Sequence, residues 1–450
     1  MAGRDKLMTT ELVPEQILPK VMSTFGLTAA YVFIICWVTG SSVMASGGWT
    51  AIPMWVLGIL TFLIPAGMAV VELGNLWPGQ GGVYIWAYRT MGGETWGGFI
   101  GGYLSWVPVI LNAASSPAVV LQFLLLAFHA ELGLMTSIIL QLVILWTVIG
   151  LALAKLAANQ RIMNIVFVVY CALTLTIFIC GLLYAGEHGS ATPFSWHDAT
   201  VPNFAAAGFL YGTVLLYLLG VETPPYNMGA EFLSVRKSGP PRMILWGSVA
   251  LVAIYLLTTL GTMMALPGDE IDPPVTGIIG MLDVAGFPGL MEICAVVLAG
   301  IIIVALMTYQ VAYSRLIFVS GLERHLPPRI FTHLNPRTRN PVTAILIQGV
   351  ISSLILVGAV LAEQHGQRHD LPAGRVVDRL AAVRLLLPVP GHHRPQEVCG
   401  SLCHRTVLAD PGRNGRGCGS PSSSVLSARS AASTTRSSPP PGSTCPPRTG

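Results

Sequence analysis

Long runs of apolar residues fill the first 360 positions of the chain, and short polar segments separate them. An apolar helix needs about 20 residues to cross the hydrocarbon layer of a bilayer. Runs of that length lie at 24–47, 51–74, 97–128, 135–154, 162–185, 204–232, 243–266, 291–320 and 341–361. The pattern predicts an all-α membrane protein with nine transmembrane helices.

The basic residues predict the orientation of these helices, because Lys and Arg accumulate in short cytoplasmic loops. With 1–23 as a cytoplasmic N-terminal segment, all 14 Lys and Arg of the first 360 residues fall on the inner side. The outer segments carry acidic residues and no Lys or Arg; they lie at 48–50, 129–134, 186–203 and 267–292. We expect a multi-pass protein of the cell (inner) membrane, surrounded by the lipid bilayer, with a cytoplasmic N-terminus.

Two of the predicted helices contain residues that resist helix formation near mid-span. The first contains Thr39, Gly40, Ser41, Ser42, Val43 and Met44, in which Gly and hydroxyl residues weaken helix propensity. The sixth contains Gly220, Val221 and Glu222 followed by two prolines, which remove backbone donors and clash with the preceding turn. We expect both helices to be discontinuous.

The positions of the two interruptions suggest an inverted repeat. Gly40 and Gly220 each lie 16 residues after the start of their predicted helix, and five helices separate the two starts. An odd number of helices reverses the direction across the membrane, so each half would begin with a broken helix. Secondary transporters place their binding site at such breaks. The pattern predicts a discontinuous-helix, inverted-repeat transporter core at 24–361, whose second half has only four of five expected helices.

The composition confines the chain to a membrane and separates its last ninety residues from the rest. Apolar residues make up 53% of the chain and charged residues only 10%, which excludes a water-soluble fold. The net charge of +4 combines −2 for residues 1–360 with +6 for residues 361–450. We expect residues 362–450 to be a disordered tail rich in Arg, Pro and Ser. Out-of-frame translation that begins near 361–370 would explain it, and a natural disordered extension is the alternative.

Several short segments resemble those of the amino acid, polyamine and organocation superfamily of permeases. They are 40–44 in the first helix, 72–74, 77–78 and 81–86 after the second, 220–222 in the sixth and 313–318 in the eighth. The run from Gly81 to Tyr88, followed by Trp96 and Gly97, is similar to the glutamate and aminobutyrate antiporter branch. The resemblance implies a core of five plus five helices with two more, twelve in all, so this chain would be truncated.

The resemblance also implies roles for individual residues. The first-helix stretch that contacts the substrate carboxylate in that family falls on Gly40, Ser41 and Ser42, with Ser in place of the family's final Gly. An aromatic gate six residues before the helix-six Glu would fall on Leu216, with Tyr217 next to it. Some proton-coupled members carry a Lys in helix five, whereas 162–185 has no basic residue, which favours exchange over a lysine switch.

Four further polar residues in or near the apolar runs are candidates for function. A carboxylate such as Glu222 near mid-span is expensive and usually has a partner or a role, here gating or coupling; capping of the broken backbone is the alternative. Glu72, near the inner surface, suits a gating ion pair. Asn112 follows Pro108 in the third helix and either lines the cavity or bonds between helices. Arg315 is expected to extend its head group toward the inner surface.

These observations predict secondary active transport of amino acids or related amines by alternating access. Substrate would contact residues 39–44, Gly220, Val221 and Asn112, and Leu216, Tyr217, Glu222 and Glu72 would gate or couple. A small amine substrate and a proton or counter-substrate are the expected partners, with no cofactor, metal or nucleic acid. The alternatives are an inactive truncated permease without helices ten to twelve and, less favoured, an intramembrane enzyme, whose nucleophile, paired aspartates or HExxH sequence we do not find in the spans.

Overall fold

The computed structural model describes residues 14, 17–77, 79–91, 100–197, 204–221, 227–231, 239–268, 271 and 277–368. All elements of this part are helical. Most are α-helices, η1 and η4 are 3-10 helices, and η2 and η3 are π-helical turns. In chain order they are α2 (Thr24–Ile35), α3 (Thr39–Ala45), η1 (Gly48–Thr50), α4 (Ala51–Gly58), η2 (Ile59–Leu63), α5 (Ile64–Leu76), α6 (Gly82–Thr90), η3 (Ile100–Leu104), α8 (Ser105–Phe128), α9 (Leu134–Ala152), α10 (Leu156–His188), α12 (Phe204–Leu218), η4 (Gly229–Glu231), α14 (Gly239–Ala265), α15 (Gly277–Val284), α16 (Pro288–Leu322), α17 (Pro328–Phe331) and α18 (Val342–Arg368).

Seven helices among the described residues are long and apolar enough to cross a membrane, and α2 with α3 makes an eighth if that bent pair is one span. The remaining prediction, a span at 204–232, corresponds to α12, which has only 15 residues, and to the short helix η4. Residues 222–226 between them lie outside the described part. The structure therefore confirms an all-helical membrane protein, while the count of nine spans stays a prediction.

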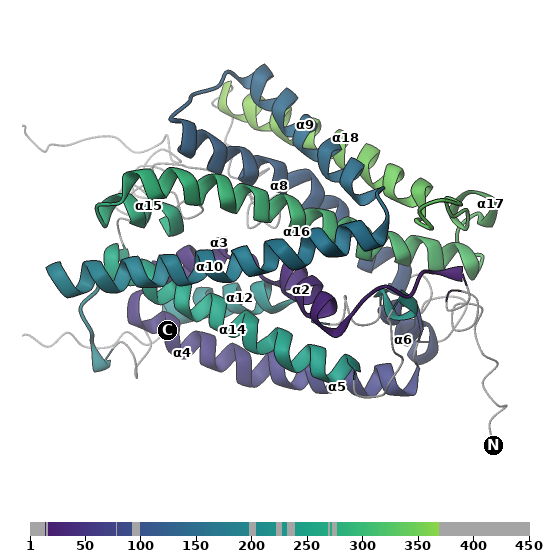
Figure 1. Cartoon of the computed structure of the whole chain (residues 1–450), viewed down its shortest axis with the longest axis horizontal. Coiled ribbons are helices and arrows are strands. Elements are labelled where there is room, and N and C mark those ends of the chain that lie inside the picture. Colours follow the sequence, from purple (N-terminus) through teal and green to yellow (C-terminus); the bar gives the residue numbers. More distant parts are fainter. Residues whose placement is uncertain are drawn as a thin grey trace, which may run out of the picture. The chain divides into compact units, whose positions relative to one another are not determined.

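The helices form two packed groups. One group contains α8, α9, α16 and α18, and the other contains α2, α3, α10, α12 and α14, with α4 against α12 (Figure 1). Helix α16 joins them, since it contacts α8, α9 and α18 on one side and α2 and α10 on the other. From Thr308 to Gly321 every residue of α16 except Tyr309 is buried. This central helix therefore lies at the core of the bundle, and α2 packs against it.

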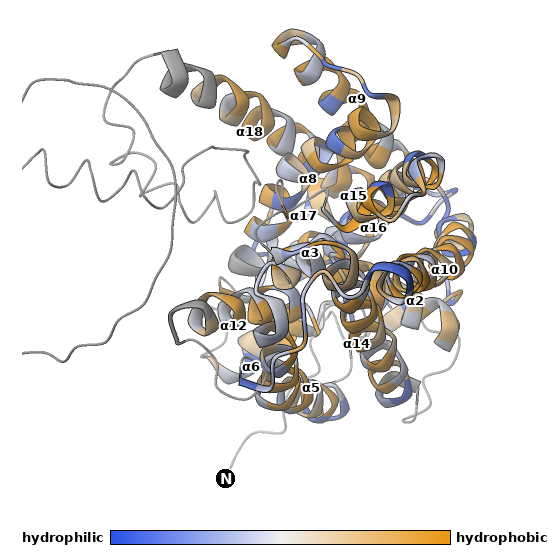
Figure 2. Ribbon diagram, turned by 90° about the vertical axis from the view of Figure 1, so that its left-hand side faces the viewer, coloured by the Kyte–Doolittle hydropathy of each residue, from blue (hydrophilic) through white to orange (hydrophobic). Residues whose placement is uncertain are grey.

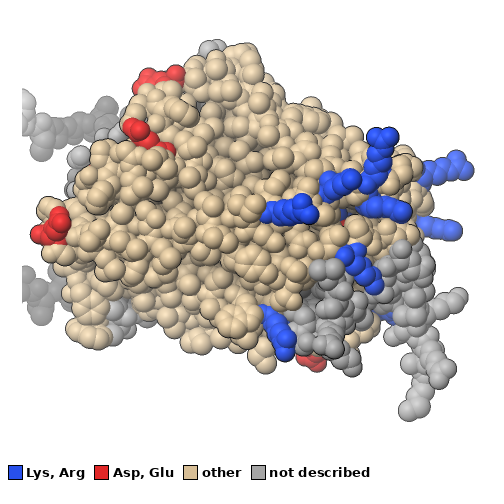
Figure 3. Space-filling model, viewed as in Figure 1, with Lys and Arg blue, Asp and Glu red and all other residues tan. Residues whose placement is uncertain are grey.

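The outer surface of the bundle is apolar along the lengths of its helices (Figure 2). Large side chains such as Met68, Trp246 and Leu354 expose 60 to 70% of their surface. Monomeric soluble proteins rarely expose contiguous apolar patches of this extent, whereas lipid contact makes them favourable. Lys and Arg gather at the end of the molecule that carries α17, and most of the visible acidic residues lie at the opposite end (Figure 3). This separation agrees with the charge pattern of the sequence.

Every described residue belongs to the first of two compact units, Met1–Pro390. Most of the predicted tail at 362–450 lies outside the described residues, because the description ends at Arg368. The disordered tail, its out-of-frame origin and the truncation remain predictions.

Candidate functional site

The first membrane helix is broken, as predicted, although not at its Gly and hydroxyl residues. Helix α2 ends at Ile35, α3 starts at Thr39, and their axes differ by 52°. Cys36 has an extended backbone conformation (φ −82°, ψ 95°), which ends the regular helical hydrogen bonding. The break lies a few residues before the predicted Gly40, because residues 39–45 form one further helical segment, α3.

Two tyrosines bind the backbone groups that the break releases. Tyr170 of α10 donates a hydrogen bond to the carbonyl oxygen of Cys36 at 3.2 Å. Tyr255 of α14 accepts one from the backbone N–H of Trp37 at 3.0 Å. Unpaired backbone groups at membrane depth cost several kcal/mol. The two phenol groups therefore pair with backbone groups at the break and stabilise it without water.

A group of buried hydroxyls lies next to the break, between α3 and α14. The oxygens of Ser41 and Thr258 are 2.7 Å apart. Ser42 is fully buried, and its Oγ has no hydrogen-bond partner among the described residues. Because buried polar atoms are nearly always paired, an orphan hydroxyl at a helix break marks a position where a ligand atom can bind.

The end of α12 covers the start of α3. The ring of Tyr217 lies so close to Gly40 that a Cβ atom at that glycine would be 2.5 Å from Cε2 of the ring. Gly220 follows with φ +103°, a conformation that L side chains rarely adopt, so the chain turns away from the helix there. Val221 is buried beside it. The structure thus places Tyr217 against Gly40 at the start of α3, whereas their role in substrate binding stays a prediction.

Other predicted site residues lie elsewhere or lack such contacts. Asn112 is half-buried on α8, and its Oδ1 accepts a hydrogen bond from Ser116 one turn along, so it is paired within its own helix. Glu72 is exposed at the end of α5 and forms no ion pair with any described residue. Leu216 is half-buried on α12. Glu222 lies outside the described residues, so its predicted role stays a prediction.

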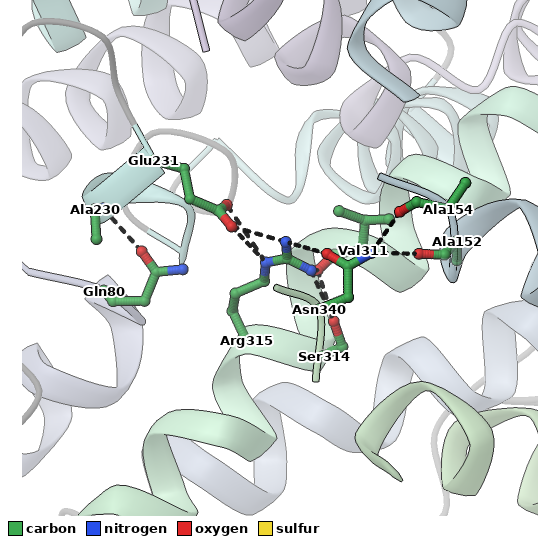
Figure 4. Close-up of polar contacts among 9 residues, drawn as sticks. All are labelled: Gln80, Ala152, Ala154, Ala230, Glu231, Val311, Ser314, Arg315 and Asn340. Carbon is green, nitrogen blue, oxygen red and sulfur yellow. Dashed lines mark hydrogen bonds and ion pairs between the residues drawn. The ribbon is translucent and has the colours of Figure 1, made fainter. Parts of the chain in front are cut away.

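A second polar centre, fully buried, lies at the end of α16 where the basic residues gather (Figure 4). The guanidinium of Arg315 is 2.8 Å from Oε1 of Glu231, and the two side chains are 1% and 0% exposed. Arg315 also donates to the carbonyl of Val311 and to Oδ1 of Asn340, at 2.9 and 3.3 Å. The expectation that Arg315 extends its head group to the surface is wrong, because a buried carboxylate holds it inside.

This buried pair joins segments that are distant in the sequence. The carbonyl of Glu231 accepts hydrogen bonds from the backbone N–H groups of Val21 and Met22, each at 3.0 Å. Gln80 accepts one from the N–H of Ala230 at 2.8 Å, and Asn340 donates to the carbonyls of Ala152 and Ala154. The network therefore ties the segment before α2 and the segment after α12 to α16 and the loop after α9.

Sequence reasoning missed Glu231, Tyr170 and Tyr255. Glu231 had a usable signal, since it is an acidic residue at the end of a predicted apolar span and Arg315 is its basic counterpart in another. Charged residues within spans usually pair with one another. The tyrosines gave no such signal, because an isolated Tyr in an apolar run is as typical of core packing as of a hydrogen-bonding role.

Comparison with known proteins agrees with this arrangement. A probable agmatine/putrescine antiporter of Lactococcus lactis is 25% identical over 251 residues, which span 55% of this chain and 53% of the antiporter, about half its length. An uncharacterized transporter of Legionella pneumophila is 21% identical over 362 residues, 76% of this chain and 74% of that protein. The family described as "Amino acid permease" matches residues 20–378. The chain therefore belongs to the amino acid permease family and is a multi-pass membrane protein.

Proposed function

We propose that the protein moves an amino acid or a related amine across the cell membrane by alternating access. The single observation that carries the proposal is the break between α2 and α3, which is followed in α3 by the buried, unpartnered hydroxyl of Ser42. Backbone and hydroxyl groups of residues 39–44 would bind the substrate carboxylate, and carbonyls near Gly220 and Val221 would bind its amino group. Both relatives are described as transporters, which favours this reading over an intramembrane enzyme.

The buried network around Arg315 supports alternation between two states. It joins the segments beside the two broken helices to α16 at the end where the basic residues lie. An access path on that side would have to separate these groups. We infer that the structure represents a state closed on the inner side, and that the opening of the Glu231–Arg315 pair accompanies release of substrate into the cytoplasm.

Exchange is the mode of coupling that the sequence favours. No basic residue lies within α10 between Ile162 and Ala185, and the group of α10 that binds the break is the neutral phenol of Tyr170. The Lactococcus relative is described as a probable antiporter of two amines, agmatine and putrescine. We therefore propose a counter-substrate that is itself an amine or amino acid.

The proposal is tested with the purified full-length chain in proteoliposomes. Vesicles preloaded with putrescine, agmatine, glutamate, aminobutyrate or leucine would be mixed with the radiolabelled form of each compound. We expect uptake of at least one compound that depends on a preloaded partner and that excess unlabelled compound abolishes. Absence of uptake for the whole panel, from protein that is folded and inserted, would favour the inactive truncated product.

Replacement of Glu222 with Gln is expected to reduce exchange by about tenfold or more and to flatten its dependence on pH. A carboxylate near mid-span is costly to keep charged. If Glu222 gates or couples, it would gain and lose a proton during transport, and the exchange rate would depend on pH. Uptake would be measured between pH 5 and 8, with Glu131→Gln as the matched control, because Glu131 is exposed and has no proposed role in transport. A Glu222→Gln variant with the rate and pH profile of the wild type contradicts the gating and coupling role.

A further inference from the structure

The hydroxyl group of Tyr255 lies between the end of α2 and the end of α12. Tyr255 belongs to α14 and is 1% exposed. Its oxygen is 3.1 Å from the carbonyl oxygen of Ile35, the last residue of α2, and 3.1 Å from that of Tyr217, near the end of α12. It also accepts the N–H of Trp37 from the break itself. One phenol therefore contacts the end of α2 and a residue one position before the end of α12.

The chemistry of the phenol restricts how it serves these groups. A tyrosine hydroxyl carries one hydrogen, whereas two carbonyl oxygens lie at equal distance from it. At any moment it donates fully to the carbonyl of Ile35 or of Tyr217, or is shared between them. The hydrogen bond can thus pass from one broken helix to the other without movement of the ring.

The ring is held independently of these hydrogen bonds. It stacks on the indole of Trp55 from α4, with centroids 4.5 Å apart and an angle of 23° between the planes. The indole N–H of Trp55 donates to the hydroxyl of Thr259 at 3.3 Å, which fixes the indole in turn. The position of the hydroxyl is therefore set by α4 and α14, and a Phe at this position would keep the same packing.

We propose that Tyr255 is a positioning residue that makes the break of the first helix and the end of the first half of the sixth helix move together during transport. The inference rests on the proposed function and deepens it, because it assigns a role to a residue that need not touch the substrate. Tyr170 differs, since its hydroxyl bonds to Cys36 and to the backbone of Val38, both of which belong to the break of the first helix. Loss of the Tyr255 hydroxyl removes the link between the two broken helices, whereas loss of the Tyr170 hydroxyl does not.

The test compares Tyr255→Phe with Tyr170→Phe and with the control Tyr184→Phe, whose ring stacks on His188 near the end of α10. Each variant would be reconstituted, and the compound of the panel with the fastest wild-type exchange would be used as substrate. We expect Tyr255→Phe to lower the maximal exchange rate per binding-competent molecule about tenfold, with the dissociation constant changed less than about threefold. Tyr170→Phe is expected to change the rate less than about threefold, and Tyr184→Phe not at all.

The exchange rate per binding-competent molecule, measured together with the number of such molecules, separates a positioning role from a purely structural one. A structural defect would lower the number of binding-competent molecules and the melting temperature, and would leave the rate per competent molecule unchanged. That result, or equal losses of rate in Tyr255→Phe and Tyr170→Phe, would overturn the inference. If the wild type exchanges none of the panel compounds, the proposed function fails and this inference fails with it. If the wild type exchanges a compound and Tyr255→Phe matches it, only the inference fails.

Discussion

Replacement of Arg315 with Met is expected to destabilise the folded protein by about 3 to 5 kcal/mol, because it leaves the Glu231 carboxylate buried without its counter-charge. Both side chains are at most 1% exposed, so water cannot take the place of the guanidinium. The loss would appear as a lower melting temperature of the purified protein in detergent. Exchange in proteoliposomes should fall with it, since the network joins the segments beside both broken helices to α16.

Two further variants make this prediction specific to the ion pair. Arg329→Met removes an exposed Arg from α17 and should leave both the melting temperature and the exchange rate near their wild-type values. The double variant Glu231→Leu with Arg315→Met removes both charges and should recover most of the lost stability. It should not recover normal exchange if the pair is needed to close the inner side. A double variant no more stable than Arg315→Met would show that the buried charge is not the cause.

Replacement of Gly40 with Ala is expected to lower the exchange rate by at least about tenfold. The added methyl group would lie 2.5 to 2.7 Å from three carbons of the Tyr217 ring, far inside the contact distance of two carbon atoms. Overpacking of this kind costs about 1 to 3 kcal/mol unless the neighbour moves. Movement of the ring would displace the end of α12 from the break, where the substrate is proposed to bind.

The steric origin of this effect is tested by a second substitution that makes room. Tyr217→Leu combined with Gly40→Ala should exchange substrate faster than Gly40→Ala alone, because the smaller side chain removes the clash. Gly300→Ala is the matched control: it adds the same methyl group within a membrane helix where no atom lies within 4 Å. If Gly40→Ala transports as well as Gly300→Ala, the close packing of Tyr217 on the first helix has no part in transport.

The sequence predicted the architecture well because the bilayer imposes simple requirements on it. Apolar length and the distribution of Lys and Arg identify the helices, and the described ones lie close to the predicted ranges. A break in the first helix was also predicted, but the Gly and hydroxyl residues that suggested it form helix α3, and the break lies before them, between Ile35 and Thr39. Its position was a few residues off, because the tyrosines that bind residues 35–37 come from α10 and α14 and stabilise the break there.

The contacts between helices could not be predicted in the same way. Glu231 and Arg315 are 84 positions apart, and Tyr255 is 218 positions from Trp37. Hydropathy does not tell which faces of two helices meet, so Arg315 seemed free to reach the surface. Hydropathy likewise gave no sign that Asn112 accepts a hydrogen bond from Ser116 on its own helix, and its place in the substrate site stays a prediction.

The attachment of the N-terminal segment to the buried network is independent of the side chains in that segment. The carbonyl of Glu231 accepts hydrogen bonds from the main-chain N–H groups of Val21 and Met22, which every amino acid except proline provides. The sequence on either side of these positions can therefore drift during evolution while the attachment persists. In this way the N-terminal segment of such a permease could acquire new sorting or regulatory signals without loss of its connection to the buried network.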